Sequence, residues 1–207
     1  MEMILITDPE LLEGEEELLI ACFEHGLENL HLRKYQATEQ ELTDLLKRIP
    51  EEYHSRILLH HHHYLVRSFQ IKGVHFNSYV TDISHFQEEN LVFSRSAHRL
   101  EDLEKVEPSI DRVLLSPVFP TISKESRRAP FSLEAIGRWV QEHEHSFKLT
   151  ALGGVAPDRI GDLARTGFDA FAVLGGVWKT FREEGREKAI EAFKLYQKRA
   201  EEWEART

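Results

Sequence analysis

Cysteine is nearly absent from this sequence. Cys22 is the only cysteine among 207 residues, so no disulfide can form within the chain. Its neighbours Leu18, Leu19 and Phe23 give it the setting of a small apolar residue inside a helix. A chain without disulfides suits a reducing compartment, and we therefore expect a cytoplasmic protein.

An excess of positive charge and long apolar runs are also lacking. The formal net charge is -10 and the sequence pI is about 5.6. Nucleic acids and anionic membranes attract basic surfaces, so we expect neither as a partner. The apolar run within residues 1–8 is too short for a signal peptide, and no later run could span a bilayer. An anionic small molecule would need a local positive site.

Linkers rich in proline, glycine or serine are missing, which predicts a single domain over residues 1–207. Short apolar runs alternate with longer amphipathic runs along the chain, and this order predicts a parallel sheet covered by helices. The number of strands, about eight, favours the α/β class and a single (β/α)8 TIM barrel. A doubly wound open sheet is the main alternative, because alternation alone does not decide whether a sheet closes.

The predicted strands are 3–7, 29–33, 56–60, 73–76, 91–95, 112–115, 148–152 and 170–174. The predicted helices are 13–24, 39–49, 63–69, 100–105, 133–142, 157–166 and a solvated outer helix over 181–203. The connection around 81–85 is too short for a helix. Three helix starts carry capping signals: Thr38 with Glu41, Ser132, and Pro157 in a first turn.

Two late strands each end in a pair of glycines, Gly153-Gly154 and Gly175-Gly176. In a barrel, ligands bind at the C-terminal ends of the strands, and phosphate often binds after the last two. Glycine lets the backbone approach a ligand, and free amides at a helix start bind anions. Tight turns are the alternative for either pair alone. Because the pairs occupy matching positions, we favour a monophosphate site.

Two further segments predict contacts to phosphate. The loop after the sixth strand offers the hydroxyls of Thr121 and Ser123 with the ammonium of Lys124, a set that suits a di- or polyphosphate. An ordinary exposed loop is the alternative. Arg33 ends the second strand, where its guanidinium could hold a leaving phosphate bidentately or form an ion pair with a carboxylate at the barrel mouth.

Histidines follow two of the strands. The run 60–63 contains four of them, and imidazole is a common zinc or nickel ligand. Adjacent residues on a strand face opposite ways, so at most two could share one ion, and we favour roles without a metal. His75 is either a ligand contact or a hydrogen-bonded core residue. Ser96 and His98 are better placed for a ligand, but no strained elbow around Ser96 indicates a hydrolase.

Several of these segments, in this order, resemble thiamine-phosphate synthase and its TenI-like relatives over nearly the whole chain. The matching segments are 4–8, 32–33, 73–75, 96–98, 117–124 and 151–155. The resemblance implies a (β/α)8 barrel that joins a hydroxymethylpyrimidine pyrophosphate to a thiazole phosphate with the help of Mg²⁺. The loop 117–124 followed by Gly153-Gly154 is its most specific part.

The resemblance also implies roles for individual residues. The implied catalytic residues are Arg33, Ser96 and Lys124. Arg33 and Lys124 would contact the pyrophosphate or its linkage, and Ser96 would contact the pyrophosphate or the pyrimidine. The implied substrate-binding residues are His31, His60, His75, Thr121, Ser123, Gly153, Gly154, Gly175 and Gly176. Such a reaction asks the protein mainly to position its substrates and to neutralise the departing charge.

The sequence departs from the family pattern at the metal-binding positions. His60-His61 stands where the family has Asn-Asp, and residues 77–80 lack the family's second acidic ligand. We therefore take His61 and Asp82 as candidate metal ligands, although Mg²⁺ prefers oxygen donors. Tyr35 replaces an expected lysine, and Lys34 lies one position early.

The main functional hypothesis is a thiamine-phosphate synthase. The alternative is a TenI-like protein, either a thiazole tautomerase or a non-catalytic binder of thiazole phosphate or thiamine phosphate. The tautomerase hypothesis lacks its histidine, because Pro117 occupies that position. A phosphosugar isomerase or aldolase would need a lysine or carboxylate base inside the barrel, and the predicted strands show none in a convincing place. A homo-oligomer is compatible with the sequence, which does not determine the oligomeric state.

Overall fold

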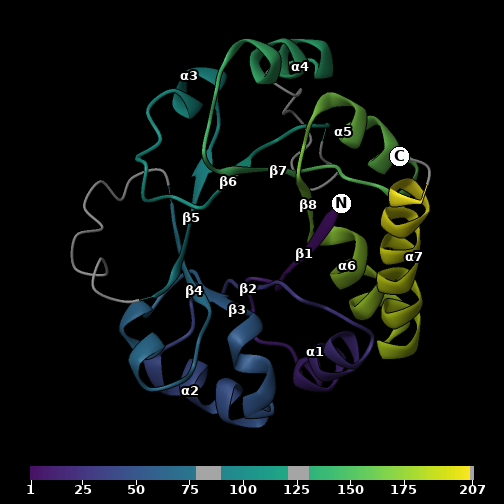
Figure 1. Ribbon diagram of the computed structural model, residues 1–207. Coiled ribbons are helices and arrows are strands. Elements are labelled where there is room, and N and C mark those ends of the chain that lie inside the picture. Colours follow the sequence, from purple (N-terminus) through teal and green to yellow (C-terminus); the bar gives the residue numbers. More distant parts are fainter. Residues whose placement is uncertain (78–89, 121–130, 206–207) are drawn as a thin grey trace.

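The computed structural model describes residues 1–77, 90–120 and 131–205. Eight parallel strands form a closed barrel in the order β1-β2-β3-β4-β5-β6-β7-β8, with helices outside it (Figure 1). The pairing of β1 with β8 closes the ring and joins Ile4 to Ala172 in register. The predicted TIM barrel is therefore confirmed, and the open doubly wound sheet is wrong.

The strands agree closely with the predicted segments. They are β1 (Glu2–Ile6), β2 (Leu30–Leu32), β3 (Ile57–Leu59), β4 (Gly73–Phe76), β5 (Val92–Ala97), β6 (Arg112–Leu115), β7 (Lys148–Leu152) and β8 (Ala170–Val173). Apolar side chains on alternate positions pack outward against the helices in one large cluster. A small second cluster, Ile4, Ile6, Leu114 and Ala172, fills the barrel interior.

The outer layer contains both α-helices and short 3₁₀ helices. The α-helices are α1 (Glu15–Glu24), α2 (Glu39–Arg48), α3 (Leu100–Leu103), α4 (Leu133–Glu142), α5 (Ile160–Thr166), α6 (Gly175–Glu184) and α7 (Arg186–Glu204). The 3₁₀ helices are η1 (Glu51–Arg56), η2 (His63–Arg67) and η4 (Pro157–Arg159). The capping box of Thr38 and Glu41, the Ser132 cap and Pro157 in a first turn are all present.

The single helix predicted over 181–203 is wrong. Two helices, α6 and α7, meet at Gly185, whose φ of 90° lies in the left-handed region that favours glycine. The break lets α6 follow β8 directly, while α7 turns to pack along α1, α5 and β1 (Figure 1). The prediction that the C-terminal helix closes the outside of the barrel is confirmed for α7.

Other features bear on the predictions for domains and membranes. Within the described part of the chain, no helix combines the length and apolar character needed to cross a bilayer. Cys22 is buried in α1, as predicted. The single domain over 1–207 stays a prediction. The connection around 81–85 lies outside the described residues.

Candidate functional site

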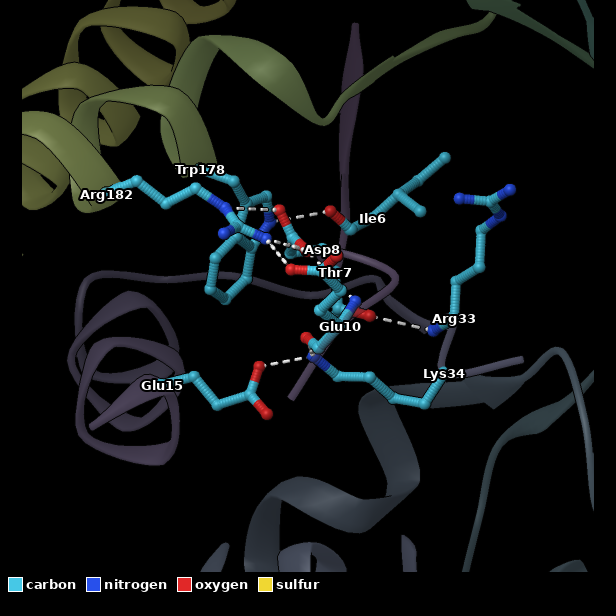
Figure 2. Close-up of polar contacts among 9 residues, drawn as sticks. All are labelled: Ile6, Thr7, Asp8, Glu10, Glu15, Arg33, Lys34, Trp178 and Arg182. Atoms are coloured by element: carbon cyan, nitrogen blue, oxygen red, sulfur yellow. Dashed lines mark hydrogen bonds and ion pairs between the residues drawn. The ribbon is translucent and has the colours of Figure 1, made fainter. Parts of the chain in front are cut away.

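Arg33 lies at the end of β2 with its backbone fixed by a neighbouring strand. The Arg33 amide donates a hydrogen bond of 2.8 Å to Thr7 Oγ1, just after β1 (Figure 2). The half-buried guanidinium lies over the Tyr35 ring, 4.9 Å from its centroid. Among residues 1–77, 90–120 and 131–205, no carboxylate forms an ion pair with it. The described residues therefore leave the Arg33 charge available to an anion, and they do not support the alternative of an ion pair.

Lys34 points away from Arg33 and is completely buried (Figure 2). Its ammonium forms an ion pair with Glu15 on α1 and donates a hydrogen bond of 2.6 Å to the Glu10 carbonyl. The same ammonium lies 5.7 Å from the centroid of the Trp178 ring. Burial lowers the pKa of Lys34 and raises that of Glu15, although the opposite charges partly offset both effects. Lys34 therefore joins β2 to α1 and does not face a ligand.

A second ion pair joins the end of β1 to α6. Arg182 donates hydrogen bonds of 3.1 and 2.8 Å to the two carboxylate oxygens of Asp8, and another of 2.8 Å to Glu10 (Figure 2). Burial would raise the pKa of Asp8, but the hydrogen bonds from Arg182 and the Glu10 amide hold it below its usual value. Both carboxylates near the end of β1 are thus engaged by an arginine.

Three histidines from different strands meet inside the barrel. His31 lies on β2, His60 directly follows β3, and His75 lies on β4; we call these residues the histidine cluster. His31 Nδ1 is 3.0 Å from His60 Nε2, and the His60 and His75 rings stack with centroids 4.0 Å apart. Burial lowers the pKa of all three imidazoles, that of His75 to about 3, so the rings are neutral near pH 7.

His75 also connects the histidine cluster to two serines of β5. Its Nδ1 lies 2.8 Å from Ser94 Oγ, and its Nε2 lies 2.9 Å from Ser96 Oγ. His75 is therefore a buried, hydrogen-bonded histidine, and its contact with a ligand stays a prediction. Ser96 is only partly buried, at the mouth, whereas the exposed His98 donates to the Ser116 carbonyl across 2.9 Å.

The two glycine pairs differ in their surroundings. Gly153 and Gly154 have φ of 94° and 66°, and an added Cβ would lie within 3 Å of atoms in the loop after β6. This pair therefore lets the loops after β6 and β7 pack together, and the Phe119 amide donates to the Gly153 carbonyl across 3.0 Å. Gly175 and Gly176 are exposed in the first turn of α6, where amides have no intrahelical acceptor. The second pair is thus the better place for a phosphate.

The remaining predicted site residues are either dispersed or not described. His61 lies beside Tyr35, with ring centroids 6.1 Å apart. His62 donates to the Ala37 carbonyl and His63 to the His75 carbonyl, so the run 60–63 does not converge on one point. Asp82, Thr121, Ser123 and Lys124 lie outside the described residues.

The described residues do not fit Mg²⁺. Its preferred ligands are oxygen atoms in octahedral geometry. His60 after β3 and His75 on β4 offer imidazole nitrogens, and the carboxylates of Asp8, Glu10 and Glu15 bind cationic side chains. His61 and Asp82 as metal ligands stay a prediction.

A sequence comparison decides the family. The family model described as thiamine monophosphate synthase matches residues 3–177. The chain belongs to this family. A solved thiamine phosphate pyrophosphorylase from Bacteroides thetaiotaomicron is 30% identical to this chain, with a TM-score of 0.85 over 97% of this chain and 98% of that one. A second such structure, from Pyrococcus furiosus, is 24% identical with a TM-score of 0.77, covering 98% and 96%.

Curated relatives carry the same family name. A thiamine-phosphate synthase from Pectobacterium atrosepticum is 26% identical over 161 residues, which are 73% of this chain and 75% of that protein. One from Proteus mirabilis is 23% identical over 145 residues, 68% of this chain and 66% of that protein. The resemblance to this family that the sequence motifs indicated is thus confirmed.

Sequence reasoning treated His31, His60 and His75 as separate ligand contacts and missed that they form one cluster. The signal available was their position, since each lies within or just after a strand on the inward-facing register. The structural role of Lys34 was also missed. Alternation along the strand would have predicted that it points opposite to Arg33.

Proposed function

We propose that the protein is a thiamine-phosphate synthase, which condenses hydroxymethylpyrimidine pyrophosphate with thiazole phosphate and releases pyrophosphate. Two features at one end of the barrel, each suited to bind an anion, support the proposal. The Arg33 guanidinium lacks a carboxylate partner among the described residues, and the first-turn amides of α6 are exposed at Gly175 and Gly176. Because all strands are parallel, the ends of β2 and β8 open at the same mouth.

Two anion sites suit a reaction that has two phosphorylated substrates. The amides of α6 would hold the phosphate of the thiazole, and Arg33 would hold the departing pyrophosphate. Ser96 at the mouth, hydrogen-bonded to His75, would contribute a hydroxyl to the pyrophosphate or to the pyrimidine. Thr121, Ser123 and Lys124 would complete the pyrophosphate contacts.

The chemistry requires no general base from the described residues. The bond between the pyrimidine methylene carbon and oxygen breaks, and both electrons leave with the pyrophosphate. The thiazole nitrogen then forms the new carbon–nitrogen bond with its own lone pair. The protein supplies position and positive charge, and removal of such a charge from a site typically lowers kcat by about 10²–10³-fold.

The test is to incubate the purified protein with both substrates and Mg²⁺ and to quantify thiamine phosphate after oxidation to thiochrome. Arg33→Gln should lower kcat/KM by at least about 100-fold. Arg48→Gln is the matched control, because Arg48 lies on α2 with half of its side chain exposed and should leave the rate unchanged. If a high concentration of wild-type protein makes no thiamine phosphate, the synthase proposal fails.

A TenI-like binding protein without synthase activity is the second candidate. It is favoured by the histidine cluster near the positions where the family resemblance expects carboxylate ligands for Mg²⁺. This candidate predicts that thiazole phosphate or thiamine phosphate raises the melting temperature without turnover. A ligand at 100 times its Kd stabilises a protein by about 2.7 kcal/mol. If neither ligand raises the melting temperature, this candidate is rejected.

A further inference from the structure

The histidine cluster has the composition of a metal site. One nitrogen from each of His31, His60 and His75 lies within 4.8 Å of the others. His31 Nδ1 and His60 Nε2 are already 3.0 Å apart. Two nitrogens bound to one tetrahedral ion at about 2.0–2.1 Å are about 3.3–3.4 Å apart. Two of the three ligands are therefore close to the spacing that a shared ion requires.

The second ring nitrogen of His31 is buried without a partner. The His31 side chain is completely buried, and its Nε2 has no hydrogen-bond partner in the part of the chain that the structure describes. A buried polar atom without a partner is rare in folded proteins and calls for an explanation. When Nδ1 of His31 binds an ion, Nε2 keeps the ring proton, so the ligand spacing rests on Nδ1 and His60 Nε2 and not on the orphaned nitrogen.

The donor set selects the kind of ion. Neutral imidazoles bind zinc and its neighbours in the first transition row, whereas Mg²⁺ requires oxygen. Catalytic zinc sites with three protein ligands keep a fourth position open. We propose that His31, His60 and His75 bind one Zn²⁺ through three imidazole nitrogens, with the fourth position open to the barrel mouth for water or a phosphate oxygen.

One of the three ligands must move when the ion binds. His75 is stacked on His60 with an angle of 20° between the rings, and both of its nitrogens contact serines. An ion lies in the plane of a ring that binds it, so His75 must leave the stack and release Ser94 or Ser96. The serine that it keeps would orient the ring, as outer-shell partners do for zinc-bound histidines. His60 is partly exposed and provides the path of entry.

This proposal does not depend on the proposed function, because it is tested by binding alone. The purified full-length protein is stripped with a chelator and titrated with ZnCl₂ by calorimetry. We expect one equivalent bound, and X-ray absorption at the zinc edge should count three imidazole nitrogens at about 2.0–2.1 Å. Wild-type protein that binds no stoichiometric Zn²⁺, or binds it with fewer than three imidazoles, overturns the proposal.

Variants distinguish this site from the other histidines of the chain, which contains 12 in all. His31→Gln and His60→Asn should each weaken Zn²⁺ binding more than about 100-fold, because the loss of an outer-shell partner alone costs 10–100-fold. His62→Asn is the matched control. Its φ of 51° suits asparagine, and its ring binds the Ala37 carbonyl, away from the cluster. Circular dichroism checks the fold of each variant.

The outcome in the variants is decisive in both directions. Loss of binding in His31→Gln and His60→Asn with retention in His62→Asn supports the site. Equal binding in all three folded variants shows that the ion is held elsewhere and overturns the site. Should His31→Gln fail to fold, the His60→Asn titration and the wild-type count of nitrogen ligands decide the matter.

Discussion

The buried ion pair between Lys34 and Glu15 makes a quantitative test of the conclusion that Lys34 is structural. Replacing Lys34 by methionine keeps most of the volume but leaves the Glu15 carboxylate without its cation in a site that is about 1% exposed. Glu15 Oε1 already lacks a hydrogen-bond partner among the described residues, and the Glu10 carbonyl would lose its donor. Removing one partner of a buried pair typically costs about 3–5 kcal/mol.

For a protein of this size, that loss should be easy to measure. One kcal/mol corresponds to about 2–4 °C in melting temperature for a chain of 150–250 residues, so Lys34→Met should lower it by roughly 6–20 °C. Urea unfolding followed by circular dichroism gives the free energy directly. Arg186→Met is the control, since the Arg186–Glu17 pair is about half exposed and should cost less than about 1 kcal/mol.

The double variant Lys34→Met/Glu15→Leu separates the pair from its surroundings. Replacing both partners of a buried pair by apolar residues is often neutral or stabilising, so most of the lost stability should return. A remainder of about 1–2 kcal/mol is expected from the unpaired Glu10 carbonyl and from the acidic first turn of α1. A single variant no less stable than Arg186→Met, or a double variant as unstable as the single, would refute this reasoning.

The pH dependence of the same variant follows from the pKa of Glu15. Burial raises that pKa, and without Lys34 no nearby ammonium offsets the effect. A carboxyl group whose pKa is higher in the folded state costs stability while it is ionised, and the cost disappears as falling pH protonates it. The stability difference between wild type and Lys34→Met should therefore be smaller at pH 5 than at pH 7.5. A constant difference would contradict the assignment to Glu15.

Three further predictions concern other parts of the molecule. Asp8→Asn should cost about 1 kcal/mol in urea unfolding, because Arg182 is 42% exposed. The pKa of Asp8 is lowered in the folded protein, so this contribution is fully present above the ordinary pKa of the carboxyl. It disappears as pH falls through the lower, folded pKa, and the stabilities of the two proteins should converge below that pH. Gly154→Ala should destabilise by about 2 kcal/mol or more, because its φ is 66° and an added Cβ would lie 2.6 Å from a backbone oxygen. Gly175→Ala should cost less than about 1 kcal/mol of unfolding free energy, because nothing lies within 4 Å of the added carbon. Equal losses of stability in the two alanine variants would contradict this contrast. Cys22 should resist Ellman's reagent until the protein unfolds, because burial raises the pKa of its thiol to about 12. Rapid labelling of the native protein would contradict that burial.

The sequence was informative wherever a feature depends on neighbouring residues. The strands coincide with short, largely apolar runs, and the starts of α2 and α4 carry the caps that their residues predict, Thr38 with Glu41 and Ser132. The Gly175-Gly176 pair was readable for the same reason, because a strand, two glycines and a helix start follow one another directly. The break at Gly185 was missed, although a glycine within a charged helical run is an available signal for a helix end.

The sequence by itself thus determined the number and order of the strands, the family motifs and the positions from which side chains enter the barrel mouth. The closed ring, the meeting of His31, His60 and His75, and the pairing of Lys34 with Glu15 were decided only by the tertiary structure. The physical reason is the distance along the sequence between the residues that make contact. Caps, turns and alternation arise from contacts within a few residues, whereas these three features depend on how separate strands and helices are placed against each other, which no local pattern encodes.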